Sequence, residues 1–228
     1  SGPLTSGYVR PTIQGGAIIC GQTELGKQLE SALSELPASA VAESAGNCLK
    51  LAIYSVFLRP ALYGFIRALP FTGLGYTRYE TRYPITRLAA WQLGVAARLL
   101  IRLPQFSEGR RRLAGAYQSA LDGVPGITLI RPAFGAVPAF ARYPFRVREP
   151  ETRDRVVAGL NRAGIGATAS YPLALADVPQ VVARVPAKDR RCPGAREVAS
   201  TIVTLPTHAY CPREIADHAR RTLIECLV

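Results

Sequence analysis

The sequence lacks methionine altogether and contains little histidine, tryptophan or lysine: two histidines, one tryptophan and three lysines in 228 residues. Its five cysteines are odd in number and show neither a C-x-x-C pair nor a Cys/His ligand spacing. This excludes a recognisable zinc site, and we expect no metal. The cysteines are instead expected to be reduced, mostly buried thiols of a cytoplasmic protein.

Arginine dominates the charge. The chain has 28 basic against 16 acidic residues and a formal charge of +12, and its only lysines are Lys27, Lys50 and Lys188. Arginine suits planar anions such as phosphate and carboxylate. The arginines are scattered and not interleaved with aromatic residues on one surface, so we expect no nucleic-acid binding. Nearly half of the residues are apolar, which excludes disorder and predicts a real core.

The pattern of the N-terminal part of the sequence predicts a loop over residues 1–14 and a buried strand over 15–20. A helix is expected next, capped by Thr23 and ended by Pro37. The strongly apolar stretch 46–71 has the length of a membrane span. However, charged residues interrupt it and Pro60 would break a continuous helix. We therefore expect two packed helices and no transmembrane segment, with a role at a membrane surface as the lesser alternative. The helices are expected at 49–58 and 61–69.

The central part predicts a polar, aromatic connector over 73–87 in which arginines alternate with tyrosines. Its glycines do not follow a dinucleotide-binding pattern. A structured loop and a ligand-facing loop both remain open for it. Two helices follow, 88–103, which Pro104 closes, and 106–121, whose Arg110–Arg112 run is expected to be a solvated face.

The second half predicts a small α+β domain. In the strand 142–147, Tyr143, Phe145 and Val147 alternate with polar neighbours, which indicates one buried face. Pro144 argues that this strand is an edge or carries a bulge. Helices are expected on one face of a mostly antiparallel sheet. The other expected elements are a strand at 127–131, a helix from Pro150 capped by Gly164, a strand at 165–170, a helical turn at 195–199, a strand at 200–205 and a helix from Pro212.

The ordered set YPFRV, LNRAGIG, a Tyr-Pro pair, PGAREVAS and LPTH, followed by a terminal helix, resembles the C-terminal half of DegT/DnrJ/StrS-type aminotransferases. These pyridoxal-phosphate enzymes transfer an amino group to keto sugars carried on nucleotides. GGAIIC with its following helix, and YPITRLAAWQLGVAARLL, extend the resemblance over nearly the whole chain. LRPALYGFIRALP and LGYTRY are most similar to a polysaccharide-biosynthesis branch.

The resemblance implies an α/β fold, that of the fold type I pyridoxal-phosphate-dependent transferases. Residues 1–104 would be the end of the large cofactor domain with its helical connection, and residues 105–228 the small α+β domain. It also implies pyridoxal 5'-phosphate as cofactor, a nucleotide sugar as substrate, glutamate as amino donor, and a homodimer with the active site at its interface.

The family holds its cofactor as a Schiff base on a lysine in a context like G-K-P-L-T. The corresponding residues here are Gly2 and Pro3 with no lysine between them, and Lys27, inside the next helix, is a poor substitute. We therefore expect that the chain is a fragment, or that a cofactor-linked lysine and modified methionines are missing from the printed residues. The resemblance further implies cofactor contacts from Ser1 and from Thr77, where the family usually has asparagine.

The implied substrate residues are Arg87, Tyr171 and His208. A hydrogen-bonded structural role for His208 remains an equal alternative, and His218 is expected at the surface. Two other functions also stay open. One is a catalytically silent module that binds a partner or an anionic glycan precursor; the other is a basic protein that binds nucleic acid or a membrane surface.

Overall fold

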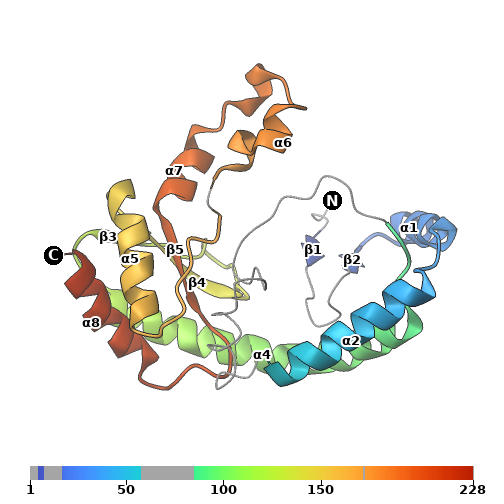
Figure 1. Cartoon of the computed structure of the whole chain (residues 1–228), viewed down its shortest axis with the longest axis horizontal. Helices are drawn as coiled ribbons and strands as arrows, with labels where there is room; N and C mark the ends of the chain where they lie inside the picture. The colour runs from blue at the N-terminus through green and yellow to red at the C-terminus, as the bar shows by residue number, and fades with distance from the viewer. Residues whose placement is uncertain (1–4, 8–16, 58–84, 172, 228) are drawn as a thin grey trace. The chain divides into compact units, whose positions relative to one another are not determined.

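The computed structural model describes residues 5–7, 17–57, 85–171 and 173–227 (Figure 1). These residues form two compact units, one ending at Leu103 and the other beginning at Pro104. The sequence predicted a cofactor domain over residues 1–104 and a small domain over 105–228. This assignment remains a prediction, because the two observed units are defined by packing alone and not by function.

In the first unit, the strand β1 (Thr5–Gly7) pairs antiparallel with β2 (Ala17–Ile19). The predicted loop over residues 1–14 is therefore wrong at β1, because these residues pair with β2, which lies 10 to 14 positions further along the chain. The helix α1 (Thr23–Glu35) follows, and its N-cap is Gln22, with no side-chain cap. The cap prediction for Thr23 is wrong because the extended backbone ends one residue earlier, at Gln22.

The helix α2 (Val41–Phe57) begins earlier than predicted because the alanine-containing stretch before residue 49 also favours helix. The predicted helix over 61–69 and nearly all of the connector 73–87 lie outside the described residues. Among the helices that the structure describes, none is both long and apolar enough to cross a membrane.

A single long helix, α4 (Ala90–Leu121), replaces the two helices predicted on either side of Pro104. Proline removes one backbone hydrogen bond and costs about 3 kcal/mol inside a helix, and the turns on both sides of it still form their own bonds. Pro104 is exposed, so its ring does not lie in the packed core. The helix continues because one missing bond does not outweigh the others.

The second unit is built on a three-stranded antiparallel sheet in the order β3-β4-β5. Its strands are β3 (Ile127–Leu129), β4 (Arg142–Val147) and β5 (Ile202–Pro206). The predicted alternation on β4 is confirmed, since Tyr143, Phe145 and Val147 are fully buried. β4 is the central strand rather than an edge. Nevertheless, Pro144 lies beyond the part that β3 pairs, so only β5 stands beside it.

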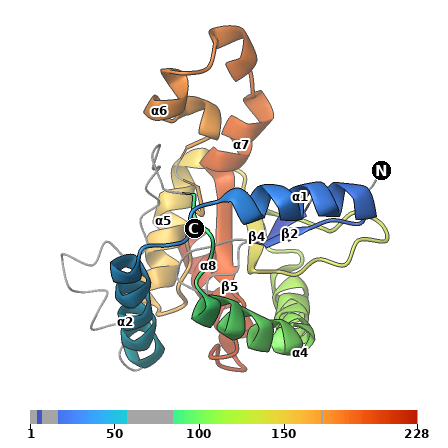
Figure 2. The ribbon, with the colours of Figure 1, turned by 90° about the vertical axis from the view of Figure 1, so that its right-hand side faces the viewer.

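The helices of this unit are α5 (Pro150–Arg162), the short α6 (Pro179–Val182), α7 (Pro193–Thr201) and α8 (Ile215–Leu227). Two 3-10 turns, η2 (Leu175–Asp177) and η3 (Ala187–Arg190), flank α6. α7 leads directly into β5, and the segment around α6 projects away from the sheet (Figures 1 and 2). The prediction of a strand over 165–170 is wrong, because Gly166 has a positive φ of 77° and only Thr168 makes an isolated bridge, to Thr204.

All buried apolar residues that the structure describes lie in the second unit. Most come from the end of α4, the inner face of the sheet, α5 and α8, and the others from α7 and the connecting segments. The largest are Tyr117, Tyr143, Phe145, Leu121, Leu160, Leu205 and Leu223. The five cysteines are free, as predicted, but they are not mostly buried: Cys48 is exposed and the other four are partly exposed. Two of them, Cys211 and Cys226, nevertheless pack against the core.

Candidate functional site

The outer face of the sheet carries an arginine that several hydrogen bonds fix in place. Arg142, the first residue of β4, donates from Nε to the Thr204 hydroxyl at 2.8 Å. Its Nη2 donates to the backbone oxygens of Gly166 at 2.6 Å and of Thr204 at 2.9 Å. Because the guanidinium is charged, these bonds are stronger than bonds between neutral groups. Arg142 therefore ties the segment after α5 to the strand β5.

Hydroxyl groups continue this network toward the segment that carries Tyr171. The Thr204 hydroxyl lies 3.1 Å from the hydroxyl of Thr168 and 2.9 Å from that of Ser170. Ser170 has a φ of 57°, a left-handed conformation that is uncommon for a residue with a side chain. The neighbouring Tyr171 is 62% exposed. The network thus holds the backbone in the conformation that presents Tyr171 to solvent.

His208 lies just beyond β5, and it too is exposed. Its Nδ1 is 3.5 Å from the Cys211 thiol, and its ring is 6.1 Å from that of Tyr210. Partial desolvation, followed by the positive charges of Arg142 and Arg110, lowers the pKa of His208. Burial raises the pKa of the Cys211 thiol. Both groups are therefore uncharged at neutral pH, unlike the thiolate–imidazolium pair of a cysteine nucleophile.

A buried tyrosine supports this end of the sheet from the core side. The Tyr117 hydroxyl donates to the backbone oxygen of Pro206 at 3.2 Å, and its ring stacks on Tyr143 with centroids 5.4 Å apart. Burial raises the pKa of Tyr117 far above its ordinary value, so it stays a neutral donor. It anchors the last residue of β5, just before the segment that carries His208.

We call Arg142, Thr204, Ser170, Tyr171 and His208 the β5-end cluster. Arg142 links the hydroxyl network that leads to Tyr171 with the segment that carries His208. It bonds to Thr204, and the charge of Arg142 lowers the pKa of His208. The sequence predicted Tyr171 and His208 but missed the other three. An arginine at an outward strand position carries no signal that distinguishes it from a solvated one, and its partner Thr204 stands 62 residues away.

The third predicted substrate residue, Arg87, belongs to the first unit. Its backbone N–H donates to the Pro37 oxygen at 2.9 Å. Its side chain lines an open cavity of about 970 Å³ among α1, α2 and the start of α4. Across this cavity, the Trp91 indole donates to the Ser44 hydroxyl at 2.8 Å. The proposed roles of Arg87, Tyr171 and His208 in binding substrate remain predictions.

The described residues offer no lysine suited to a Schiff base. Lys27 is paired with Glu24 at 2.9 Å and its side chain is 67% exposed. Lys50 and Lys188 are exposed as well. A Schiff-base lysine needs a protected site that shifts its pKa. The predicted lysine position between Gly2 and Pro3, and the predicted cofactor contacts Ser1 and Thr77, lie outside the described residues, so the part that the structure shows does not fit covalent attachment of the cofactor.

The described residues also contain no group of three or more histidine, cysteine or acidic side chains that could hold a metal ion.

Among solved structures, the chain is similar to that of DesV from S. venezuelae in complex with a ketimine intermediate, with 26% identity and a TM-score of 0.55. The match covers 73% of this chain and 44% of DesV. A DegT/DnrJ/EryC1/StrS aminotransferase from Brucella abortus matches with 25% identity over 72% of this chain and 43% of its own, at a TM-score of 0.52. The PLP form of the putative sugar aminotransferase Spr1654 from Streptococcus pneumoniae, 21% identical, shares the fold with a TM-score of 0.53, covering 73% of this chain and 43% of its own. The fold is that of the fold type I aminotransferases, so the predicted fold class is confirmed.

The sequence profile of the DegT/DnrJ/EryC1/StrS aminotransferase family matches residues 60–223, and the chain belongs to this family. A curated relative, the erythromycin biosynthesis sensory transduction protein EryC1 of Saccharopolyspora erythraea, is 31% identical over 145 residues, which are 64% of this chain and 38% of EryC1. The chain spans less than half the length of the relatives it matches. The resemblance to the family inferred from the sequence is thus confirmed.

Proposed function

We propose that the protein is a pyridoxal 5'-phosphate-dependent aminotransferase that transfers an amino group from glutamate to a nucleotide-linked keto sugar. The observation that carries this proposal is the family match over residues 60–223. The likeness to DesV with its ketimine intermediate supports it. A cytoplasmic homodimer with the active site at its interface completes the proposal.

The proposal also covers the pathway in which this amino transfer takes part. We place the protein in polysaccharide biosynthesis on the motifs LRPALYGFIRALP and LGYTRY. The name of EryC1 instead points, for that protein, to erythromycin biosynthesis. Both pathways would use the same amino transfer, so the identity of the nucleotide sugar that is aminated distinguishes them.

When bound, the cofactor supplies an electron sink for the carbon that gains or loses the amino group. The residues of this chain act on the substrate. Arg87 would bind a diphosphate or carboxylate, for which its planar guanidinium is suited. Tyr171 and His208, both of the β5-end cluster, would contact the sugar. Because its pKa is lowered, His208 would do so as a neutral hydrogen-bonding group.

The test is borohydride reduction of the whole protein after incubation with pyridoxal phosphate, followed by peptide mass mapping. The expected result is one adduct on the lysine that the family resemblance places between Gly2 and Pro3 and that the printed residues lack, together with loss of the cofactor absorbance. Absence of saturable cofactor binding would overturn the proposal. Amino transfer from glutamate to a set of nucleotide-linked keto sugars then names the substrate.

The exposure of the three lysines favours a second candidate, a catalytically silent aminotransferase-like module. Such a module would bind a nucleotide sugar without forming a reducible adduct. Equilibrium binding of the sugar, measured beside the borohydride experiment, separates the two. Binding to DNA that falls steeply with salt would instead support the basic, nucleic-acid-binding alternative.

A further inference from the structure

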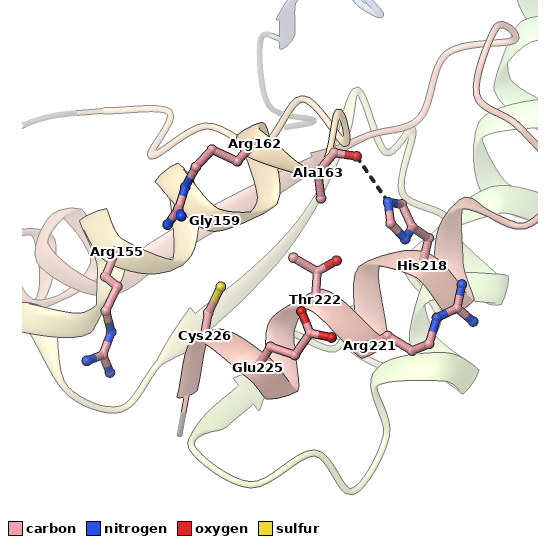
Figure 3. A pocket seen from close by; sticks show the side chains of 9 residues that line it. All are labelled: Arg155, Gly159, Arg162, Ala163, His218, Arg221, Thr222, Glu225 and Cys226. Atoms are coloured by element: carbon pink, nitrogen blue, oxygen red, sulfur yellow. Dashed lines mark hydrogen bonds between the residues drawn. The ribbon is translucent and has the colours of Figure 1, made fainter.

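The helices α5 and α8 pack against each other and leave a groove of about 550 Å³ along their contact (Figure 3). Gly159 allows the close approach, because the Cys226 sulfur fills the space that a side chain at residue 159 would need. Three arginines line the groove, two from α5 and one from α8. They are Arg155, Arg162 and Arg221.

Some arginines of the same unit are paired with carboxylates. Arg146 is paired with Glu197 and Arg196 with Asp177, both at hydrogen-bond distance. By contrast, none of the three groove guanidinium groups has an ion pair or hydrogen bond with any residue that the structure describes. Each therefore retains its donors for a partner that comes from outside.

Thr222 adds a hydroxyl group to the groove. The residue as a whole is only 8% exposed and lines the groove, but its hydroxyl reaches solvent and is bonded to none of the described residues. This hydroxyl is therefore free to donate to a ligand. Figure 3 shows this hydroxyl between α5 and the side chain of His218. A ligand acceptor in the groove would satisfy it.

His218 closes one end of the groove and is partly buried, which corrects the expectation of a surface residue. Its Nε2 lies 3.0 Å from the Ala163 carbonyl oxygen. A carbonyl only accepts, so Nε2 carries the proton and the other ring nitrogen remains available. The Ala163 carbonyl, just after α5, thus holds the imidazole in place.

We propose that this groove binds a phosphate group, either free or as part of a larger molecule. The three arginines and the single carboxylate of the lining, Glu225, leave a formal charge of +2. This complements a phosphate, which carries close to two negative charges at neutral pH. Arginine forks and a threonine hydroxyl are the donors that phosphate oxygens accept. The proposal does not depend on the aminotransferase function.

The experiment titrates the whole protein with inorganic phosphate at constant ionic strength, by calorimetry and by NMR of the His218 ring. Saturable binding is expected, and the double variant R162Q/R221Q should weaken it by about tenfold or more, since bonds to charged groups are worth about 1.5–3 kcal/mol each. T222V, which keeps the side-chain shape, should weaken it severalfold. R148Q, an exposed arginine outside the groove lining, is the matched control and should not change it.

Glu225 supplies a test of opposite sign. Because its carboxylate repels the ligand, E225Q should tighten phosphate binding severalfold. Binding that R162Q/R221Q leaves unchanged, or that E225Q weakens, would overturn the proposal, as would the absence of any saturation. A poly-glutamate peptide that binds where phosphate does not would also overturn it, in favour of an acidic protein partner. Tighter binding of a phosphate monoester than of inorganic phosphate would support the proposal and identify the larger source.

Discussion

The sulfur of Cys226 on α8 occupies the space that a Cβ on Gly159 of α5 would need. Gly159→Ala should therefore destabilise the protein even though alanine favours helix. The propensity gain is about 0.5–1 kcal/mol, whereas overpacking costs about 1–3 kcal/mol. We expect a net loss of about 1 kcal/mol in the free energy of unfolding, measured by urea denaturation.

Gly115→Ala on α4 is the matched control, because nothing lies within 4 Å of its added Cβ. It should stabilise the protein by up to about 1 kcal/mol. Combining Gly159→Ala with Cys226→Ala should remove most of the clash, so the two effects should not add. Simple additivity in this double-mutant cycle would contradict the packing argument.

Thr204→Val should destabilise the β5-end cluster. The hydroxyl accepts from Arg142 and contacts the hydroxyls of Thr168 and Ser170, and the residue is 5% exposed. Valine keeps the shape but leaves these donors without their partner, at a cost of about 1–3 kcal/mol. Thr128→Val, at an exposed position of β3, should change stability by less than about 0.5 kcal/mol. Equal effects of the two substitutions in thermal unfolding would show that the hydroxyl network contributes nothing.

The sheet strands could be predicted because their signal is local. Alternation over Arg142–Val147 gave the buried face of β4, and Pro150 gave the start of α5. The failures have physical reasons of two kinds. Pro104 was expected to end a helix, but neighbouring turns outweigh one lost hydrogen bond. Residues 165–170 were expected to form a strand, but the positive φ of Gly166 allows only a single bridge.

The site was less predictable than the fold because its bonds join distant parts of the sequence. Tyr171 and His208 could be proposed only from the family resemblance, and their roles stay predictions. The partner of Arg142 is 62 residues away, and no periodicity in the sequence relates the two. The α5–α8 groove was missed for the same reason: Arg162 and Arg221 look like ordinary solvated residues until two helices place them along one groove.

The pKa of His208 should be below its ordinary value of 6.5 in the folded protein, because of partial desolvation and the charges of Arg142 and Arg110. The unfolded chain then binds more protons between the folded pKa and 6.5. This group's contribution to stability is therefore present above 6.5 and is lost as the pH falls through the folded pKa. An NMR titration of the His208 ring protons measures the midpoint directly.

Removing the charge of Arg142 or Arg110 should raise the midpoint of the His208 titration. Arg142→Gln should have the larger effect, because Arg142 is the stronger of the two charge contributions. Arg110→Gln is the safer variant for folding, since Arg110 makes none of the hydrogen bonds of the cluster. The control Arg148→Gln should leave the midpoint unchanged. A midpoint that rises in neither Arg142→Gln nor Arg110→Gln would show that their charges do not reach the imidazole.

The two units should differ sharply when they are produced separately. Every buried apolar residue that the structure describes lies in the second unit, whereas the buried residues described in the first unit are the polar Asn47 and Gln92. Folding stability comes mainly from burying apolar surface, so residues 104–228 should melt cooperatively alone and residues 1–103 should not. Phe145→Ala should cost the second fragment about 3–5 kcal/mol, since this ring is fully buried. Calorimetry and circular dichroism check both fragments, and a cooperative transition in residues 1–103 alone would contradict the argument.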